Sequence, residues 1–421
     1  MNRQGYDANL SALDPPRTLS ANDRWGYYAA LRELGEVVRD DTRNAWLVTS
    51  HRLCKEVQRQ DESVWRSLMA YEQPEFLGMD WETYVEYQGG PRRINLLTGE
   101  EHARLHRWWM AAFSPKVISG WRETVLRPVA EAQLKRFMGD GRGELGSLAD
   151  NVHIRVIAGT LGMPWDDDAW MDRWVELTHA NQLVKRYMSS PEVPPGVVES
   201  AIAASAEMRE ELLHWVRRYR SGEGDYLISM MWRDFPGLFE NVDEGDVLAN
   251  LKPAFETTST RSAIRNALYV LVADSQLART VRGPDPKELG RFLEEVFRLY
   301  GGIELPRIAL RDVELGGVLI RAGEAVIPIA GSANVDPARF TCPHEIDTTR
   351  TGLRDHLFFN QGPRACPGQN LARAEIEETV LAVLERLPGL RFDQDAEQPS
   401  FETTGFEGRW QPLNVVFEHG G

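Results

Sequence analysis

The sequence predicts a mainly helical protein of the α+β class, with one large helical domain and a small β-sheet region. Amphipathic helical patterns cover most of residues 100–300. Strand-like segments are short and lie within residues 37–49, 313–327 and 401–418. The 421 residues suffice for a large core, and we expect a single domain over residues 1–421, with an irregular segment at 1–19.

Composition narrows the class of protein. A net charge of −15 argues against nucleic acid as a partner. No apolar run approaches the ~18 residues of a membrane span, and the polar N-terminus shows no signal peptide, so we expect a cytoplasmic protein that is not membrane-bound. Cys54, Cys342 and Cys366 are too few and too scattered for a disulfide framework or a CxxC zinc site.

The N-terminal part alternates between helix and strand. A helix is expected over about 21–34, capped by Ser20 and ended by Gly35. Two short strands follow within 37–49, and Ser50 is a candidate cap for the next helix.

Residues 61–98 are rich in aromatic side chains, Pro and Gly, without a clear period. Two interpretations stay open at this point. One is a hydrophobic cluster beneath a long loop, and the other is a binding loop or lid.

Helices dominate from Glu100 onward. Ser114-Pro115 has the pattern of an N-cap followed by a first-turn proline. Further helices are expected up to Phe137 and over about 145–161, 165–186, 197–220 and 243–274. Pro253 lies inside the last of these and should bend it.

The segment from Phe359 to Gly368 reads FNQGPRACPG and presents one thiol just before a predicted helix. The positive end of a helix favours a thiolate over a thiol. Gly362 and Gly368 are expected to allow tight turns and close approach to a flat, bulky group, while two prolines stiffen the loop.

Read as F-x-x-G-x-R-x-C-x-G, this segment resembles the haem-binding loop of the cytochrome P450 superfamily. Other motifs occur in the order of that family. Glu295-x-x-Arg298, 71 residues before Cys366, resembles the E-x-x-R motif of the helix that props the haem loop. Three further segments resemble family motifs: Glu100–Leu105, Ala254–Thr258 and Ala333–Pro337. The resemblance implies the cytochrome P450 fold.

The resemblance also implies roles for individual residues. Cys366 would be the axial thiolate ligand of the haem iron, and Glu256 with Thr257 would relay protons to bound dioxygen. The other residues expected to bind the haem are Phe359, which packs near the sulfur, Gly368 in the loop, and the propionate partners Arg364, Arg307 and His102.

Several positions depart from the family pattern. His106 replaces the usual propionate-binding Arg, so that either His106 or the adjacent Arg107 is expected to take its place. Asn360 replaces a common Gly, and Val335 replaces an Arg. Pro253 and Ala254 replace the usual small residues before Glu256.

The implied function is that of a haem-thiolate monooxygenase. It would use haem b and dioxygen to hydroxylate or dealkylate a mostly apolar small organic substrate. The protein is expected to be a monomer that receives electrons from a separate ferredoxin and its reductase. The ferredoxin would dock on a basic patch of four arginines, Arg107, Arg354, Arg364 and Arg373. The alternatives are a P450-fold enzyme that performs oxidative coupling or uses peroxide, a non-catalytic haem protein, and a cysteine hydrolase that uses Cys366.

Overall fold

A computed structural model describes most of the chain as two compact units, each built from segments that are distant in sequence. The first unit comprises Met1–Ala70, Ser262–Cys366 and Leu390–Val416, and the second comprises the remainder. The described residues are 23–60, 62–67, 80–139, 141–183, 193–255, 257–302, 304–404 and 407–418. The mainly helical class with small sheets is confirmed. The single domain stays a prediction, and the segment 1–19 lies outside the described residues.

The first unit contains a five-stranded sheet with the strand order β1-β2-β8-β5-β3. Strands β2 and β8 are parallel, whereas the other neighbours are antiparallel. The strands predicted within 37–49 are confirmed as a hairpin in which Val37 lies opposite Val48. The bounds are β1 (Val37–Asp40), β2 (Ala45–Val48), β8 (Ala325–Pro328), β5 (Arg307–Ala309) and β3 (Trp65–Ser67).

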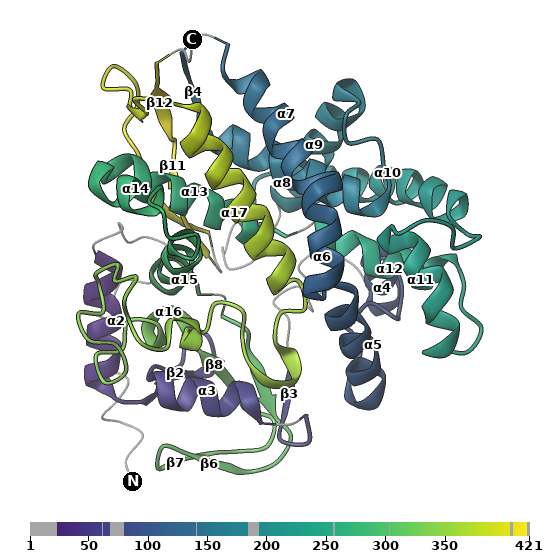
Figure 1. Ribbon diagram of the computed structural model, residues 1–421. Helices are drawn as coiled ribbons and strands as arrows, with labels where there is room; N and C mark the ends of the chain where they lie inside the picture. The colour runs from purple at the N-terminus through teal and green to yellow at the C-terminus, as the bar shows by residue number, and fades with distance from the viewer. Residues whose placement is uncertain are drawn as a thin grey trace. The chain divides into compact units, whose positions relative to one another are not determined.

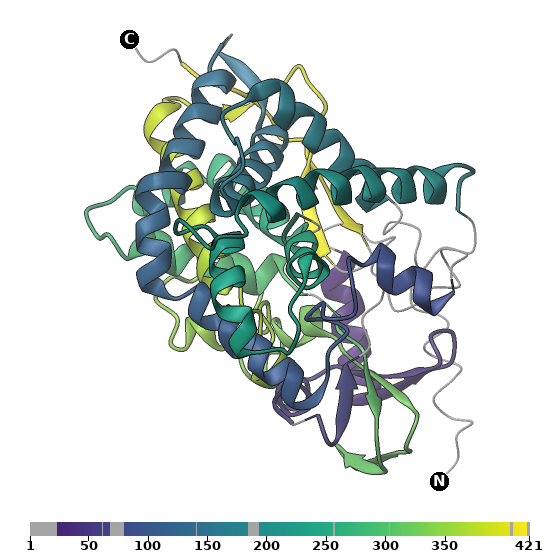
Figure 2. The same ribbon diagram turned by 90° about the vertical axis from the view of Figure 1, so that its right-hand side faces the viewer.

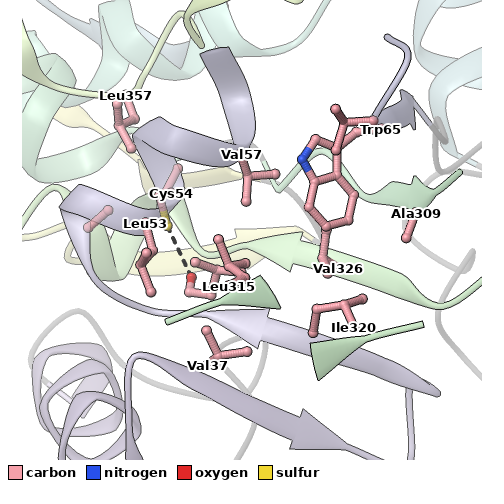
Figure 3. Close-up of a cluster of buried hydrophobic side chains, with 14 residues drawn as sticks. Val37, Leu53, Cys54, Val57, Trp65, Ala309, Leu315, Ile320, Val326 and Leu357 are labelled. Atoms are coloured by element: carbon pink, nitrogen blue, oxygen red, sulfur yellow. Dashed lines mark hydrogen bonds between the residues drawn. The ribbon is translucent and has the colours of Figure 1, made fainter. Parts of the chain in front are cut away.

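Helix α3 (His51–Arg59) covers this sheet with an apolar face. Ser50 caps the helix as predicted, because its hydroxyl oxygen accepts a hydrogen bond from the backbone N–H of Leu53. Figure 3 shows Leu53, Cys54 and Val57 above the strands, with Trp65 beside them. The Cys54 thiol donates to the carbonyl of Val48 over 3.0 Å, and burial raises its pKa, so Cys54 is a structural thiol.

The rest of the first unit consists of helices and small antiparallel pairs (Figure 1). Its helices are α2 (Asp23–Leu34), most of α13 (Ser259–Ala273), α14 (Ser275–Val281), α15 (Glu288–Tyr300) and α16 (Ala330–Ala333). The paired strands are β6 (Val313–Leu315) with β7 (Val318–Ile320), β10 (Ser400–Thr404) with β11 (Glu407–Gln411), and β9 (Arg391–Phe392) with β12 (Asn414–Val416).

The second unit is almost entirely helical. Its elements are α4 (Trp81–Tyr87), α5 (Gly99–Ala112), α6 (Pro115–Trp121), α7 (Arg127–Phe137), β4 (Arg142–Glu144), α8 (Leu145–Leu161), α9 (Asp168–Leu183), α10 (Val197–Arg218), α11 (Leu227–Asp234), α12 (Glu244–Phe255) and α17 (Gln369–Arg386). Helices α7 and α17 lie side by side (Figures 1 and 2), where Arg122 and Arg127 both bond to Glu378. Within the described ranges, no helix is long and apolar enough to cross a membrane.

Two predicted boundaries in the second unit are confirmed, and one predicted helix is wrong. Helix α6 begins at Pro115 with Ser114 at its N-cap. Helix α8 ends at Gly162, whose φ of 80° suits a residue without a Cβ. The helix expected over 243–274 is interrupted rather than bent, because α12 ends at Phe255 and α13 begins at Ser259.

In the aromatic stretch at 61–98, some of the described aromatic side chains are buried and others are exposed. Trp65 belongs to the core cluster under α3, and Tyr84 on α4 is fully buried. Trp81, by contrast, is 55% exposed. Residues 61 and 68–79 lie outside the described residues, so the lid interpretation stays a prediction.

Asp355 ties α3 to the segment that precedes the thiol loop. Lys55 and Arg339 both donate hydrogen bonds to its carboxylate, Arg339 over 2.6 Å. Burial alone would raise the pKa of Asp355, but these bonds hold the pKa below its usual value.

This lowered pKa predicts a specific loss of stability in acid. The carboxylate contributes its stabilisation above its unfolded pKa of about 3.9 and loses it as the pH falls through the lower folded value. The urea midpoint of the parent should therefore fall as the pH is lowered from about 5 to about 2, and that of Asp355→Asn should fall less over the same range. The exposed Asp395→Asn serves as the control and should follow the parent; parallel curves for parent and Asp355→Asn would contradict the prediction.

Candidate functional site

The thiol loop turns sharply at two residues with positive φ. Asn360 has a φ of 53°, which Asn tolerates better than most residues, so it can replace the family's glycine here. Gly362 has a φ of 70°, and a Cβ on it would lie 2.5 Å from the carbonyl oxygen of Gln58 at the end of α3. Gly368 also lies in a turn, as expected, but its φ of −78° is open to any residue, so the turn does not require glycine there. The loop closes where the N–H of Cys366 donates to the carbonyl of Phe359 over 2.7 Å.

Phe359 is held by other aromatic rings of the first unit. Its side chain is buried, and its ring lies edge-on to Phe358 at 4.6 Å and to Phe297 at 5.3 Å. Phe297 belongs to α15, so that helix and the thiol loop share one aromatic cluster. The backbone that leads to Cys366 therefore starts from a packed position.

The predicted Glu295–Arg298 pair is present on α15, and both side chains have no exposed surface. Two parallel hydrogen bonds of 2.8 Å join them. Arg298 also donates to the backbone carbonyls of Asn334, Pro343 and Glu345. A buried ion pair is stable only when its remaining donors are satisfied, and these carbonyls satisfy them.

Long-range partners of this pair were missed by the sequence analysis. Arg350 donates to both oxygens of Glu295 over 3.2 Å, and the N–H of Asp347 donates to the same carboxylate. Asn334 accepts from the N–H of Leu357 over 2.7 Å. No local spacing marks these contacts, because they join residues 23 to 55 positions apart.

Arg307 and Arg364 form a cationic site in the first unit. Arg307 is buried, and burial together with the nearby Arg364 lowers its pKa to about 10, partly offset by Glu62. Its Nη1 donates to the carbonyls of Leu305 and Pro306, but its buried Nη2 has no hydrogen-bond partner among the described residues. Arg364 donates to Glu62. An incoming carboxylate would satisfy the orphaned Nη2.

Helix α5 presents two imidazoles on one face. His102 is buried, and the ring of His106, one turn later, lies 5.5 Å from it. Arg107 points elsewhere, since its side chain is 65% exposed and bonds to Glu100 over 3.0 Å.

The interruption between α12 and α13 carries Thr257. Its hydroxyl donates to the carbonyl of Pro253 over 3.2 Å. Pro253 lies inside α12, where its nitrogen has no hydrogen to donate. The Thr257 hydroxyl bonds to the Pro253 carbonyl, which a continuing helix would use as an acceptor for a backbone N–H. Glu256 lies outside the described residues.

Gln182 on α9 bridges this interruption and was also missed. Its amide nitrogen donates to the carbonyl of Phe255 over 3.0 Å, and its amide oxygen accepts from Arg261. Gln182 thereby fixes the last residue of α12 and the first turn of α13. Only the fold reveals this role, because Gln182 lies more than seventy positions earlier in the chain.

The structure thus groups the predicted site residues within each unit. Phe359, Cys366, Arg307 and Arg364 belong to the first unit, and His102, His106 and Thr257 belong to the second. The first group fits a haem, because it combines a loop-held thiol with a buried guanidinium nitrogen that has no acceptor among the described residues.

Solved structures share this fold. CalO2 superposes with a TM-score of 0.81 over 95% of this chain and 97% of its own, at 23% identity. Cytochrome P450 MoxA from Nonomuraea recticatena gives a TM-score of 0.76 over 94% of this chain and 95% of its own, at 25% identity. The fold is therefore the cytochrome P450 fold, as the resemblance predicted.

Sequence comparison places the chain within a family. The family profile described as Cytochrome P450 matches residues 289–414. Mycinamicin IV hydroxylase/epoxidase from Micromonospora griseorubida is 31% identical over 304 residues, which cover 69% of this chain and 71% of that protein. 6-Deoxyerythronolide B hydroxylase from Saccharopolyspora erythraea is 28% identical over 397 residues, 89% of this chain and 91% of that protein. The chain belongs to the cytochrome P450 family and is a monooxygenase that uses haem and dioxygen.

Proposed function

We propose that this cytochrome P450 inserts one oxygen atom of dioxygen into a mostly apolar small organic substrate, with electrons from a separate ferredoxin and its reductase. The observation that carries the proposal is the thiol loop, in which Cys366 follows a sharply turned segment. Phe359 of that segment packs on Phe297 of α15, the helix of the buried Glu295–Arg298 pair. The haem b group, when bound, supplies the activation of dioxygen.

The residues of the chain would hold that group from several directions. Cys366 would ligate the iron, with Phe359 packed near its sulfur and Gly368 in the loop. Arg307, through its orphaned Nη2, and Arg364 would bind propionates. His102 and His106 would act as further propionate partners on α5. The exposure of Arg107 and its bond to Glu100 favour His106 over Arg107.

Thr257 would take part with Glu256 in the relay of protons, by accepting a hydrogen bond from the group that carries them. Because the Thr257 hydroxyl donates its hydrogen to Pro253, its oxygen lone pairs remain available to accept from a water molecule or a protonated acid. Gln182 would hold the end of α12 and the first turn of α13 in position so that this hydroxyl stays in place.

The substrate is expected to contact five stretches that correspond to family pocket positions: 61–98, 180–200, 253–257, 301–308 and 403–406. Their apolar and aromatic side chains support an apolar substrate. Relatives named for mycinamicin IV and for 6-deoxyerythronolide B support an organic small molecule.

The expected ferredoxin surface changes in one respect. Arg364 is only 11% exposed and pairs with Glu62, which removes it from the docking residues. Arg354 is 78% exposed and Arg107 is 65% exposed, so each remains available to an acidic partner. Arg373 is half-buried and donates to Gln369.

Replacement of Thr257 tests the proposed proton delivery. The assay would use the compound that gives the largest low-spin to high-spin shift in a substrate screen, with ferredoxin and reductase. In Thr257→Val, product formed per dioxygen consumed should fall about 100-fold, because general acid–base groups contribute on that order, while dioxygen consumption continues. The neighbouring Thr258→Val should stay near the parent ratio. An unchanged ratio in Thr257→Val, or turnover with peroxide but never with ferredoxin, would contradict the proposal.

A further inference from the structure

His356 lies ten residues before Cys366 and connects the thiol loop to α15. Its side chain is 2% exposed. Its Nε2 lies 2.8 Å from a carboxylate oxygen of Glu294, and its Nδ1 lies 3.3 Å from the backbone nitrogen of Phe358. Neither residue was singled out by any sequence motif.

The hydrogen bonds define which nitrogen of His356 carries the proton. The backbone N–H of Phe358 can only donate, so Nδ1 accepts. Nε2 therefore bears the hydrogen and donates to Glu294. Glu294 is itself buried, and Arg354 donates to its other oxygen over 3.2 Å. The carboxylate thus fixes the orientation of the imidazole.

Three successive contacts fix the backbone between His356 and Phe359. Nδ1 of His356 accepts a hydrogen bond from the N–H of Phe358, and the side-chain oxygen of Asn334 accepts one from the N–H of Leu357 over 2.7 Å. The carbonyl of Phe359 then accepts the N–H of Cys366 over 2.7 Å. Movement of the Phe358 peptide would shift this carbonyl and with it the backbone of Cys366.

We propose that His356, oriented by Glu294, is a positioning residue that sets the conformation of the thiolate loop through the N–H of Phe358. The inference rests on the proposed role of Cys366 as the axial ligand. The groups that surround an axial ligand tune both the retention of the metal and its reduction potential. Through the backbone of the thiol loop, His356 would thereby influence the reduction potential of the haem iron.

Two amide substitutions separate the two hydrogen bonds of His356. In His356→Asn, the side-chain oxygen can still accept from the N–H two residues later, the geometry of an Asx turn. In His356→Gln, the longer amide can still donate to Glu294 but leaves the Phe358 N–H without its acceptor. His344→Asn is the matched control, because His344 is exposed and its ring lies tilted against that of Trp25 at 4.9 Å.

Two quantities are measured. The first is the ratio of oxidised to reduced haem protein at a fixed solution potential. The second is how long the thiolate Soret band persists in the reduced, carbon monoxide-bound protein. We expect His356→Gln to change the ratio about tenfold, which corresponds to about 59 mV for one electron, and to lose the thiolate band faster than the parent. His356→Asn and His344→Asn should stay close to the parent in both.

The inference would be overturned if the redox ratio and the thiolate band of His356→Gln matched those of the parent. It would also be overturned if His356→Gln and His356→Asn changed them equally. A merely structural role predicts that the urea midpoints of the two variants fall together while the ratio does not move. Absence of a thiolate band in the parent would instead overturn the proposed role of Cys366, so the two failures can be told apart.

Discussion

Replacement of Glu295 by Gln is expected to cost about 3–5 kcal/mol of folding stability, because it breaks a buried ion pair and leaves Arg298 with an uncompensated charge. Arg350 would lose the same partner. A loss of this size is a large share of the 5–15 kcal/mol typical of a folded protein. Arg298 also donates hydrogen bonds to three backbone carbonyls of the first unit. We therefore expect the substitution to destabilise the loop that carries Cys366 as well.

Urea unfolding of the haem-free protein, followed by circular dichroism, measures this loss. Glu123→Gln is the matched control, because Glu123 forms a surface pair with Arg127 and both side chains are largely exposed. The control should change stability by no more than about 1 kcal/mol. Equal midpoints for Glu295→Gln and Glu123→Gln would show that the buried pair does not stabilise the fold.

Arg307→Met is expected to change haem affinity and haem-free stability in opposite directions. Haem affinity should fall about 10–100-fold, because the group proposed to bind a propionate is removed. The haem-free protein should be as stable as the parent or more stable, because a buried guanidinium with an orphaned Nη2 is costly. The lowered pKa of Arg307, about 10, reflects the same cost, which a bound carboxylate would relieve.

Haem transfer to a competing apoprotein measures the first effect, and the urea midpoint of the haem-free protein measures the second. Arg321→Met is the control, because Arg321 is 61% exposed and pairs with Asp312 at the surface. It should alter haem affinity little. A destabilised haem-free Arg307→Met with parental haem affinity would assign Arg307 a structural role only.

The parts of the fold that depend on local sequence were predicted well. The hairpin at Val37–Val48, the cap at Ser50 and the helix start at Pro115 follow from neighbouring residues, and the structure has all three. The extent of the interruption after Phe255 could not be predicted, because it depends on Gln182 from another helix.

In the candidate site, too, some features could be predicted from the sequence and others depend on distant contacts. The Glu295–Arg298 pair could be predicted, because its E-x-x-R motif stands 71 residues before Cys366, in the order of the family motifs. The turn at Asn360 and the ordinary φ of Gly368 could not, because backbone angles within a loop depend on what packs against it, here the end of α3. Arg350 and His356 act through contacts that span 55 and 62 positions, which leave no local pattern.

The absorption spectrum of the reduced, carbon monoxide-bound protein tests the central claim most directly. Cys366 as the axial thiolate predicts a Soret band at the position typical of thiolate ligation in the parent and in Cys342→Ala, whose thiol is exposed, and its loss in Cys366→Ala. A parent band at the position typical of histidine ligation, or a thiolate band that persists in Cys366→Ala, would contradict the assignment.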